Sequence, residues 1–469
     1  MKIIARKSEV GQLQKLLDSA APEFAVVYGR RRVGKTFLVN RFFNDNFTFK
    51  VTGLAKKDKT TQLWNFGEAL KKQGSPLCPT PKNWCEAFNS LRILLENTKT
   101  PGKKVVFIDE LPYMYSPHSD LVIAIEHFWN DWGCTQEDLL LIVCGSATSW
   151  ITKKILKNKG GLHNRVTSKI YLRPFNLCEC QEYLISNGFQ YEKKDILECY
   201  MIMGGIPYYL SLLDRSLSVA QNVDRMFFRR KGALDGEFEN LYASLFENSE
   251  PYIKVIDALS KRNCGLTRKE IIAATGIPNG GGLTNILSDL DDCDIIRKYR
   301  AFGKKENDAI YQLTDFYTLF YYKFIKKYGT SDKDFWIYQV STPAHNAWAG
   351  IAFEQLCLYH HLQIEKKLGI FGILTENFAW RGEDAQIDLV IKRSDKIINL
   401  CEIKYWDSPY TITKKYREEL EYKISAFREQ LKQRRTLHLV FISTYGLKPN
   451  EYSQIAQNEV TMSDLFEKL

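Results

Sequence analysis

The stretch FAVVYGRRRVGKTFLVNRFF, residues 24–43, decides how the first part of this chain folds. It begins as a short apolar strand, continues through the loop GRRRVGKT at residues 29–36, and ends in a helical stretch. A strand, a glycine loop, a Lys-Thr pair and a helix in this order are the context that the pattern GxxxxGK[ST] requires. Backbone N–H groups of such a loop surround phosphate oxygens, and the helix N-terminus adds a partial positive charge. The stretch therefore predicts a P-loop that binds a nucleoside triphosphate, which we take to be ATP with Mg²⁺.

Two side chains of this P-loop have distinct expected roles. Lys35 should reach the β- and γ-phosphates, and the Thr36 hydroxyl should ligate Mg²⁺. The residues expected to contact the nucleotide are the loop and the first helical position: Gly29, Arg30, Arg31, Arg32, Val33, Gly34, Lys35, Thr36 and Phe37.

A second acidic strand, which a P-loop site needs, is present in KKVVFIDELP, residues 103–112. Its apolar run is typical of a central parallel strand that is buried on both faces. Asp109 stands at the end of the run, where it could hold Mg²⁺ through water, and Glu110 is the candidate to polarise the attacking water. Taken alone, the segment could equally be an acidic turn after a strand, but its place after a P-loop favours the catalytic interpretation.

Three further segments read as strands: FTFKVTG at 47–53, DLLLIVCGSA at 138–147 and KIYLRP at 169–174. Ser146 ends one of them, where an adjacent strand would present a hydroxyl near the γ-phosphate. Five strands that alternate with helices predict a doubly wound α/β sheet, with the nucleotide at the carboxyl ends of the strands.

The order of these motifs, with LRPFN and GGIPYYL after them, resembles the archaeal-type P-loop ATPases of the AAA-related and STAND group over roughly the first 230 residues. The resemblance implies a catalytic role for Glu110 and a sensor role for Ser146. It also aligns Gly205 and Pro207 with a Gly-x-Pro element near the lid helices. Arg165 aligns with an arginine that senses the γ-phosphate, although the stretch before it reads Leu162-His163-Asn164 where the family has Leu-Tyr-Gly, so His163 and Asn164 differ.

From Pro251 the pattern predicts three short helices and a strand hairpin, which is the order of a winged helix-turn-helix. Thr267 and Glu270 form a capping box, and Gly276 should end that helix. Such modules often read DNA, and basic residues of the wing could meet phosphates: Arg297, Lys298, Arg300, Lys304 and Lys305. The third helix, however, carries Asp289, Asp291 and Asp292, so an internal packing or regulatory module remains the alternative.

The segment AQIDLVIKRSDKIINLCEIKYW, residues 385–406, reads as a strand hairpin. If Ser394 to Lys396 form a three-residue loop, Asp388 lies opposite Glu402, and Lys404 shares their face, because strand side chains alternate with period two. Val390 and Leu400 line the rest of that face. The opposite face should collect the apolar residues Ile387, Leu389, Ile391, Cys401 and Ile403.

Two carboxylates can hold Mg²⁺ or Mn²⁺, and a lysine can position a water or stabilise charge that develops on phosphate. The segment resembles the PD-(D/E)XK nuclease superfamily, and the resemblance implies catalytic roles for Asp388, Glu402 and Lys404, with Asp388, Glu402 and Glu354 as metal ligands. Gln430 matches an often polar position, whereas Ile387 replaces the usual proline. A surface ion-pair ladder is the alternative, since kinship of fold does not secure activity.

Bulk composition limits the remaining classes. The 469 residues carry a formal charge of +10, which is compatible with a polyanionic partner, and eleven cysteines with no CxxC pair, which favour a reducing cytoplasm over a disulfide framework. No apolar stretch is long enough for a membrane helix. We therefore expect ATP and nucleic acid as partners, no membrane, and leave self-association open.

The predicted fold class is α/β multidomain: a P-loop NTPase parallel sheet, a winged helix-turn-helix and an α/β nuclease-like C-terminal domain. The expected bounds are 1–175 for the ATPase core, 176–248 for a helical lid, 249–330 for the winged helix and 331–469 for the nuclease-like domain. The leading functional hypothesis is an ATPase coupled to a metal-dependent nuclease. The alternative is a STAND-like ATP switch whose C-terminal domain is a non-cleaving interaction module.

Overall fold

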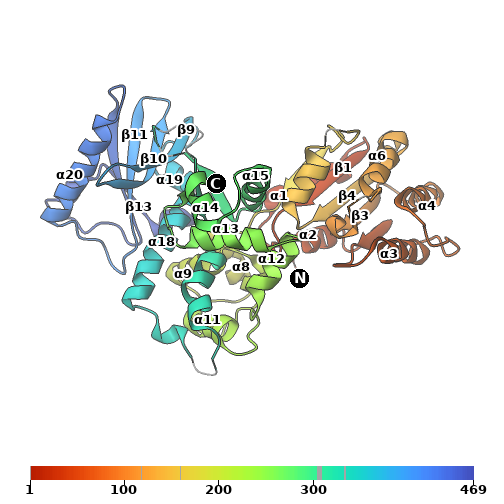
Figure 1. Ribbon diagram of the computed structural model, residues 1–469, viewed down its shortest axis with the longest axis horizontal. Helices are drawn as coiled ribbons and strands as arrows, with labels where there is room; N and C mark the ends of the chain where they lie inside the picture. Colours follow the sequence, from red (N-terminus) through yellow and green to blue (C-terminus); the bar gives the residue numbers. More distant parts are fainter. Residues whose placement is uncertain (1, 118, 159, 301, 304–308, 332–333) are drawn as a thin grey trace. The chain divides into compact units, whose positions relative to one another are not determined.

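The structure is a computed structural model that describes residues 2–117, 119–158, 160–300, 302–303, 309–331 and 334–469. The chain divides into two compact units (Figure 1). The first contains Met1–Pro174 and Leu241–Glu247, and the second contains Phe175–Asn240 and Asn248–Leu469. The finer division into four parts remains a prediction. Within the described residues, no helix has the length and apolar character needed to cross a membrane.

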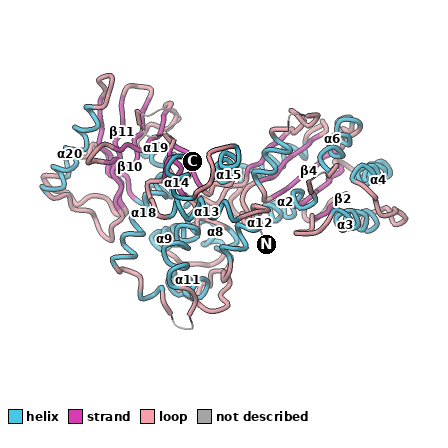
Figure 2. The backbone as a smooth tube through the Cα atoms, viewed as in Figure 1, coloured by secondary structure: helices cyan, strands magenta, loops and turns pink. Residues whose placement is uncertain are grey.

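The first unit is built on a parallel sheet of five strands in the order β2-β3-β4-β1-β5. Every neighbouring pair in this sheet is parallel, which confirms the expected α/β class for this part of the chain. Figure 2 shows the strands in magenta beside the cyan helices. The strands are β1 (Glu23–Tyr28), β2 (Phe49–Thr52), β3 (Lys104–Asp109), β4 (Leu139–Gly145) and β5 (Ser168–Tyr171). β4 lies between β1 and β3, so the predicted P-loop strand and the predicted acidic strand are not direct neighbours.

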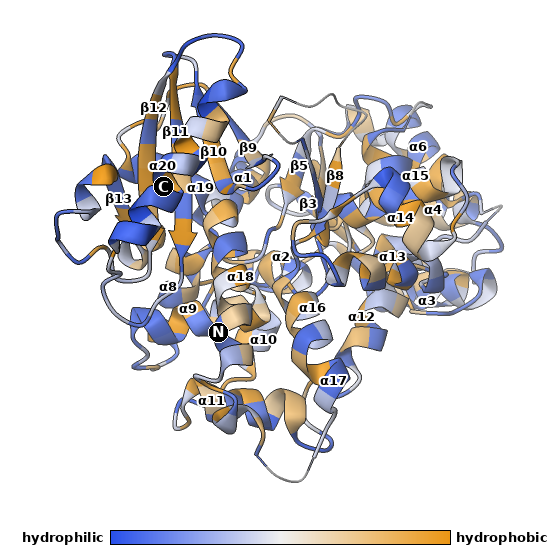
Figure 3. Ribbon diagram, turned by 60° about the vertical axis from the view of Figure 1, so that its left-hand side comes forward, coloured by the Kyte–Doolittle hydropathy of each residue, from blue (hydrophilic) through white to orange (hydrophobic). Residues whose placement is uncertain are grey.

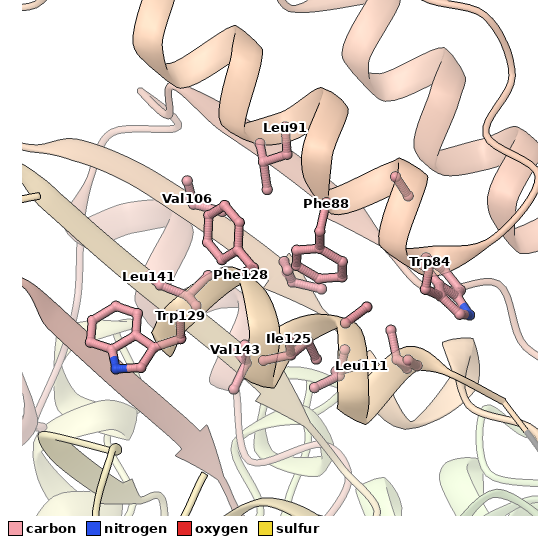
Figure 4. Packing of buried hydrophobic residues seen from close by; sticks show 14 of the residues in the cluster. Trp84, Phe88, Leu91, Val106, Leu111, Ile125, Phe128, Trp129, Leu141 and Val143 are labelled. Atoms are coloured by element: carbon pink, nitrogen blue, oxygen red, sulfur yellow. The ribbon is translucent and has the colours of Figure 1, made fainter. Parts of the chain in front are cut away.

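The helices of this unit cover a large aromatic core (Figure 4). Trp84 and Phe88 of α4 pack with Phe128 and Trp129 of α6 over the buried strand residues Val106, Leu141 and Val143. Asn83 and Asp58 cap α4 and α3 by accepting backbone N–H groups, which satisfies otherwise unpaired donors. The helices are α1 (Lys7–Asp18), α2 (Lys35–Phe42), α3 (Lys59–Lys72), α4 (Trp84–Asn97), α5 (Leu111–Met114), α6 (Leu121–Asp131) and α7 (Thr148–Ile151).

The second unit begins with a helical segment. Its helices are α8 (Leu177–Ser186), α9 (Lys193–Met203), α10 (Pro207–Ser211), α11 (Val219–Val223) and α12 (Glu237–Leu245), the last of which spans residues of both units. Buried Asp224, just after α11, accepts hydrogen bonds from the N–H groups of Phe335, Trp336 and Ile337. One carboxylate thereby ties this segment to residues more than a hundred positions later in the chain.

Three helices and a small antiparallel sheet follow: α13 (Glu250–Ser260), α14 (Arg268–Thr275) and α15 (Gly281–Asp292), with β6 (Leu266–Thr267), β7 (Ile296–Tyr299) and β8 (Ile310–Leu313) in the order β6-β8-β7. The Thr267–Glu270 capping box and the left-handed Gly276 end of α14 are both present. Asp289 of α15 turns inward and accepts a hydrogen bond from Tyr252. The wing residues Lys304 and Lys305 lie outside the described residues.

The C-terminal sheet has the order β13-β12-β11-β10-β9 and is antiparallel on the β9 side and parallel on the β13 side. Its strands are β9 (Thr375–Arg381), β10 (Gln386–Arg393), β11 (Ile397–Lys404), β12 (Thr436–Ser443) and β13 (Asn458–Thr461). Figure 3 colours β10, β11 and β12 largely orange, in keeping with their buried apolar side chains. The remaining helices are α16 (Phe316–Phe320), α17 (Lys326–Tyr328), α18 (Pro343–Tyr359), α19 (His361–Lys367) and α20 (Lys414–Glu429).

Candidate functional site

The loop between β1 and α2 depends on its two glycines. Gly29 has φ of 142°, and a Cβ atom there would lie 2.3 Å from the carbonyl oxygen of Leu172. Gly34 has φ of 91° and caps the N-terminus of α2. Only glycine meets both demands without strain, since L-residues rarely adopt these backbone angles. The sequence motif thus appears as the expected strand, loop and helix.

Lys35 and Thr36 are positioned by the first turn of α2. Lys35 is 5% exposed, and its ammonium donates to the carbonyl oxygens of Gly29 and Arg30, at 3.0 and 2.9 Å. Thr36 Oγ1 donates to Asp109 Oδ2 at 2.8 Å. This hydrogen bond brings the end of β3 to the P-loop across the intervening strand. A hydroxyl and a carboxylate oxygen are ligands that Mg²⁺ accepts, so the pair fits the ion expected there.

Glu110 and Ser146 are joined by hydrogen bonds. Glu110 Oε2 accepts both the N–H of Ser146, at 3.1 Å, and its hydroxyl, at 2.9 Å. Glu110 also has a left-handed φ of 47°, a conformation that costs free energy for a residue with a side chain. The sequence placed both residues near the γ-phosphate, but it did not foresee that Ser146 would hold the Glu110 carboxylate.

One cation near the loop has no counterpart in the sequence-based assignment. Arg6 is buried, has a left-handed φ of 60°, and donates to the carbonyl oxygen of Val33 at 3.3 Å. It therefore supports the P-loop backbone from the residue before α1. The only sequence signal was a basic residue ahead of an amphipathic helix, which is too common to single out.

The structure gives the positions of Arg165 and Pro207 but does not test their roles. Arg165 is exposed in the turn before β5. Pro207 begins α10 in the second unit, just after Gly205, where a Cβ atom would meet the carbonyl oxygen of Phe175 at 2.1 Å. The nucleotide-linked roles of both residues remain predictions.

The β10–β11 hairpin has the predicted register. Its pairs run from Lys392–Ile398 to Leu389–Cys401, which is the register that predicts Asp388 opposite Glu402, and the Asp388 carboxylate accepts the N–H of Ile403 beside Glu402. One part of the prediction was wrong: Ile387 packs with Val390 and Leu400 instead of on the other face. The reason is a β-bulge, because the register of β10 against β9 shifts between Ile387 and Val390. An extra residue in a strand reverses the facing of everything beyond it.

Glu402 is 2% exposed, and three side chains among the described residues contact its carboxylate. Lys404 and Tyr416 approach Oε1 at 3.0 and 2.6 Å, and Lys423 donates to Oε2 at 2.7 Å. Burial raises the pKa of Glu402, but Lys404 and Lys423 outweigh it, and the net pKa is lowered. Lys423 and Tyr416 were not foreseen, although the 416, 420, 423 and 427 spacing marks the buried face of α20.

The other two carboxylates of this region are less well compensated. Burial, with Glu402 next, raises the pKa of Asp388 to about 6, and burial, with Asp388 next, raises the pKa of Glu354 to about 8. Asp388 accepts the N–H of Ile403 at 3.3 Å. The structure therefore gathers Glu354, Asp388 and Glu402 in one neighbourhood. Among the described residues, however, no three His, Cys, Asp or Glu side chains are arranged to hold a metal ion.

Gln430, matched to the nuclease motif, has a structural partner, since its amide oxygen accepts the indole N–H of Trp380 at 2.9 Å. Arg297, expected to meet phosphate, instead turns inward: it donates to Gln312 Oε1, and burial lowers its pKa while Glu354 lies close enough to oppose that effect. Beside it, the exposed Lys298 and Arg300 border a groove of about 510 Å³ against β9.

Residues 4–213 match a family model described as an ATPase domain found predominantly in Archaea. An uncharacterized protein of Methanocaldococcus jannaschii is 24% identical over 430 residues, which cover 89% of this chain and 90% of that protein. Among solved structures, a Walker-type ATPase of Pyrococcus abyssi is 17% identical over 68% of this chain and 95% of its own, with a TM-score of 0.47. The ORC2 protein of Aeropyrum pernix is 12% identical over 77% and 96%, with a TM-score of 0.39. The part of this chain that carries the P-loop is thus similar to an archaeal-type ATPase domain.

Proposed function

We propose that the first unit binds ATP with Mg²⁺ and hydrolyses it. The observation that carries the proposal is the 2.8 Å hydrogen bond from Thr36 to Asp109, because it joins the phosphate loop to the acidic strand end. Lys35 supports it, since its ammonium is oriented by two carbonyl oxygens at the base of the loop. The match of residues 4–213 to an ATPase domain points the same way.

The residues of this site divide the work. Lys35 binds the β- and γ-phosphates, and Thr36 and Asp109 hold Mg²⁺, which neutralises phosphate charge when it is bound. Glu110 orients the attacking water and takes up its proton. Because Ser146 occupies one oxygen of Glu110, turnover requires that this bond loosens or that the second oxygen acts.

The test is a calorimetric titration of ATP and Mg²⁺ into the protein and its Lys35→Ala variant. We expect about a tenfold to hundredfold loss of affinity, since charge-assisted hydrogen bonds to phosphate disappear. Lys50→Ala is the matched control, because Lys50 is a lysine of the same unit that is paired with Asp45 on the surface. Equal ATP affinity in a folded Lys35→Ala variant contradicts the proposal.

The second candidate function is metal-dependent cleavage of a phosphodiester at the β10–β11 hairpin. The observation that favours it is the crowding of Asp388 and Glu354, whose raised pKa values mark carboxylates that lack full compensation. A divalent cation would supply that compensation. Asp388, Glu402 and Glu354 would have to move closer together to hold the ion, because no three such side chains are arranged for one among the described residues, and Lys404 would face the phosphate. Glu402 would first have to exchange Lys423 for the ion.

The small β6-β8-β7 sheet with α13, α14 and α15 supports a winged helix-turn-helix that contacts nucleic acid through its exposed basic residues. The competing function is a regulatory ATP switch, in which the C-terminal region binds a partner without cleavage. Incubation of the protein with labelled DNA and RNA distinguishes phosphodiester cleavage from this regulatory switch. Cleavage that needs Mg²⁺ or Mn²⁺ and is lost in Asp388→Ala supports hydrolysis, whereas intact substrate with every cation supports the switch.

A further inference from the structure

A line of aromatic side chains runs from Glu402 to the surface of the C-terminal sheet. The Tyr416 hydroxyl donates to Glu402 at 2.6 Å. The Tyr416 ring lies 5.7 Å from that of Tyr410, and the Tyr410 ring lies 5.8 Å from that of Trp406. Trp406 is 54% exposed, although it stands only two residues after Lys404. An indole that is half in water at this position adds little to the core.

Backbone hydrogen bonds hold this surface in shape. The N–H of Trp406 donates to Thr444 Oγ1 at 3.1 Å, and the N–H of Tyr410 donates to the Gly446 carbonyl oxygen at 2.8 Å. Gly446, which accepts this second hydrogen bond, has φ of 80°, a left-handed backbone angle that favours glycine. A second exposed ring, Tyr445, is 41% exposed on the same pair of loops. Both rings are therefore presented by connected segments at the carboxyl ends of the parallel strands β11 and β12.

Exposed lysines stand on the same segments as these rings. Lys448 is exposed, and its N–H donates to the Tyr410 carbonyl oxygen, while Lys414 and Lys415 are exposed at the start of α20. Lys194 Nζ lies 5.7 Å from the centre of the Tyr445 ring, and it also pairs at 2.8 Å with Asp407, the residue after Trp406. Flat apolar rings among positive charges complement a strand whose bases are unpaired and whose backbone is anionic.

We infer that Trp406 and Tyr445 form a stacking surface for unpaired nucleotides, which leads a single strand of nucleic acid past Lys404. The inference rests on the proposed phosphodiesterase function for its purpose, but binding at this surface does not require cleavage. Duplex is a poor ligand, because neighbouring base pairs already cover the faces on which an indole would stack.

The experiment measures binding of fluorescein-labelled oligothymidylate and oligouridylate, about a dozen nucleotides long, to the full chain in EDTA. Trp406→Ala is expected to weaken both by about tenfold or more, and Tyr445→Ala by less. Trp406→Phe should keep most of the affinity, since it retains a ring. Trp64→Ala in the first unit is the matched control, because Trp64 is 52% exposed, and it should leave binding unchanged. A duplex of equal length should bind more weakly and should not respond to Trp406→Ala.

Either of two results with Trp406→Ala overturns the inference: this variant binds single strands as well as Trp64→Ala does, or it loses affinity for single strand and duplex equally. Absence of binding to either form also overturns it. The hydrolytic proposal is judged separately with Mg²⁺ present. If no substrate is cut but binding still depends on Trp406, the hydrolytic proposal fails and the stacking surface stands. If substrate is cut while Trp406→Ala binds normally, the reverse holds.

Discussion

In the P-loop the ammonium of Lys35 bonds to two carbonyl oxygens, whereas in the β10–β11 hairpin the ammonium groups of Lys404 and Lys423 bond directly to the Glu402 carboxylate. Carbonyl oxygens carry only partial charge, so the P-loop keeps a positive charge that an incoming phosphate can neutralise. At the hairpin, Lys404 of β11 and Lys423 of α20 already neutralise the Glu402 carboxylate. A metal ion at the hairpin must therefore compete with two lysines.

The carboxylates of the two regions also differ in the charge of the groups that bond to them. Asp109 and Glu110 are held by the neutral hydroxyls of Thr36 and Ser146, which a nucleotide or a water can replace at small cost. Glu402 is held by charge, and removal of one partner from a buried ion pair leaves the other exposed to an apolar environment. The carboxylates of the P-loop region can therefore exchange their partners for a ligand at small cost, whereas the Glu402 carboxylate is already stabilised without a ligand.

The comparison is tested most strongly by Glu110→Gln. The amide can still accept from Ser146, so geometry and ATP binding should persist, but it cannot take a proton from water. We expect turnover to fall by about a hundredfold to ten-thousandfold in a phosphate-release assay. Glu68→Gln, at a surface ion pair with Lys71, is the control. Wild-type turnover in Glu110→Gln would move the catalytic role elsewhere.

At the hairpin the equivalent test is stability. Glu402→Ala leaves Lys423 and Tyr416 without their shared acceptor and should cost about 3 kcal/mol, the low end for a broken buried pair because Lys404 is partly exposed. Asp388→Ala should cost little, since the pKa of Asp388 is raised and its removal relieves repulsion from Glu402. Urea unfolding at pH 7 measures both. A larger loss in Asp388→Ala would reverse our account of which carboxylate is compensated.

The second unit also contains a buried histidine, which joins the end of α18 to the start of α8. His360 Nε2 accepts the N–H of Leu177, its Nδ1 lies 2.9 Å from the Leu356 carbonyl oxygen, and burial lowers its pKa to about 4. The unfolded chain binds this proton near pH 6.5 and the folded chain does not. Stability is therefore full above pH 6.5 and falls as the pH drops toward 4, by up to about 3 kcal/mol. His360→Gln should flatten this dependence in urea unfolding between pH 7 and 5, and His127→Gln should not.

The two regions also differ in how far sequence predicts them. The P-loop residues lie within eight positions, and the strand before them and helix after them are local signals, so the site could be read directly. The hairpin register followed from the length of its loop. Because strand side chains alternate with a period of two, a loop that is one residue longer or shorter would move them to the other face. The β-bulge between Ile387 and Val390 could not be foreseen, because it depends on pairing with β9, which is specified elsewhere in the chain.

Contacts between distant segments account for the other omissions. Lys423 and Tyr416 reach Glu402 only because α20 packs on the sheet. Arg297 was predicted to meet phosphate because its neighbours are basic, yet alternation along β7 turns it inward to Gln312 and leaves Lys298 exposed. Ser146 was placed correctly at a strand end, but its bond to Glu110 depends on the left-handed conformation of Glu110.

The smallest expected effect concerns the exposed cations of β7. If the wing contacts nucleic acid through phosphates, the double variant Lys298→Ala, Arg300→Ala should weaken duplex binding and reduce the slope of log affinity against log salt by up to about two, since each lost phosphate contact releases about one counterion fewer. The control is the double variant Lys15→Ala, Lys71→Ala, which removes two cations from the first unit and therefore has the same net charge as the β7 double variant. Titrations over a range of salt concentrations measure both slopes. Equal slopes in the two double variants would assign β7 to packing against β9, and nucleic-acid contact would then fall to the aromatic surface of the C-terminal sheet alone.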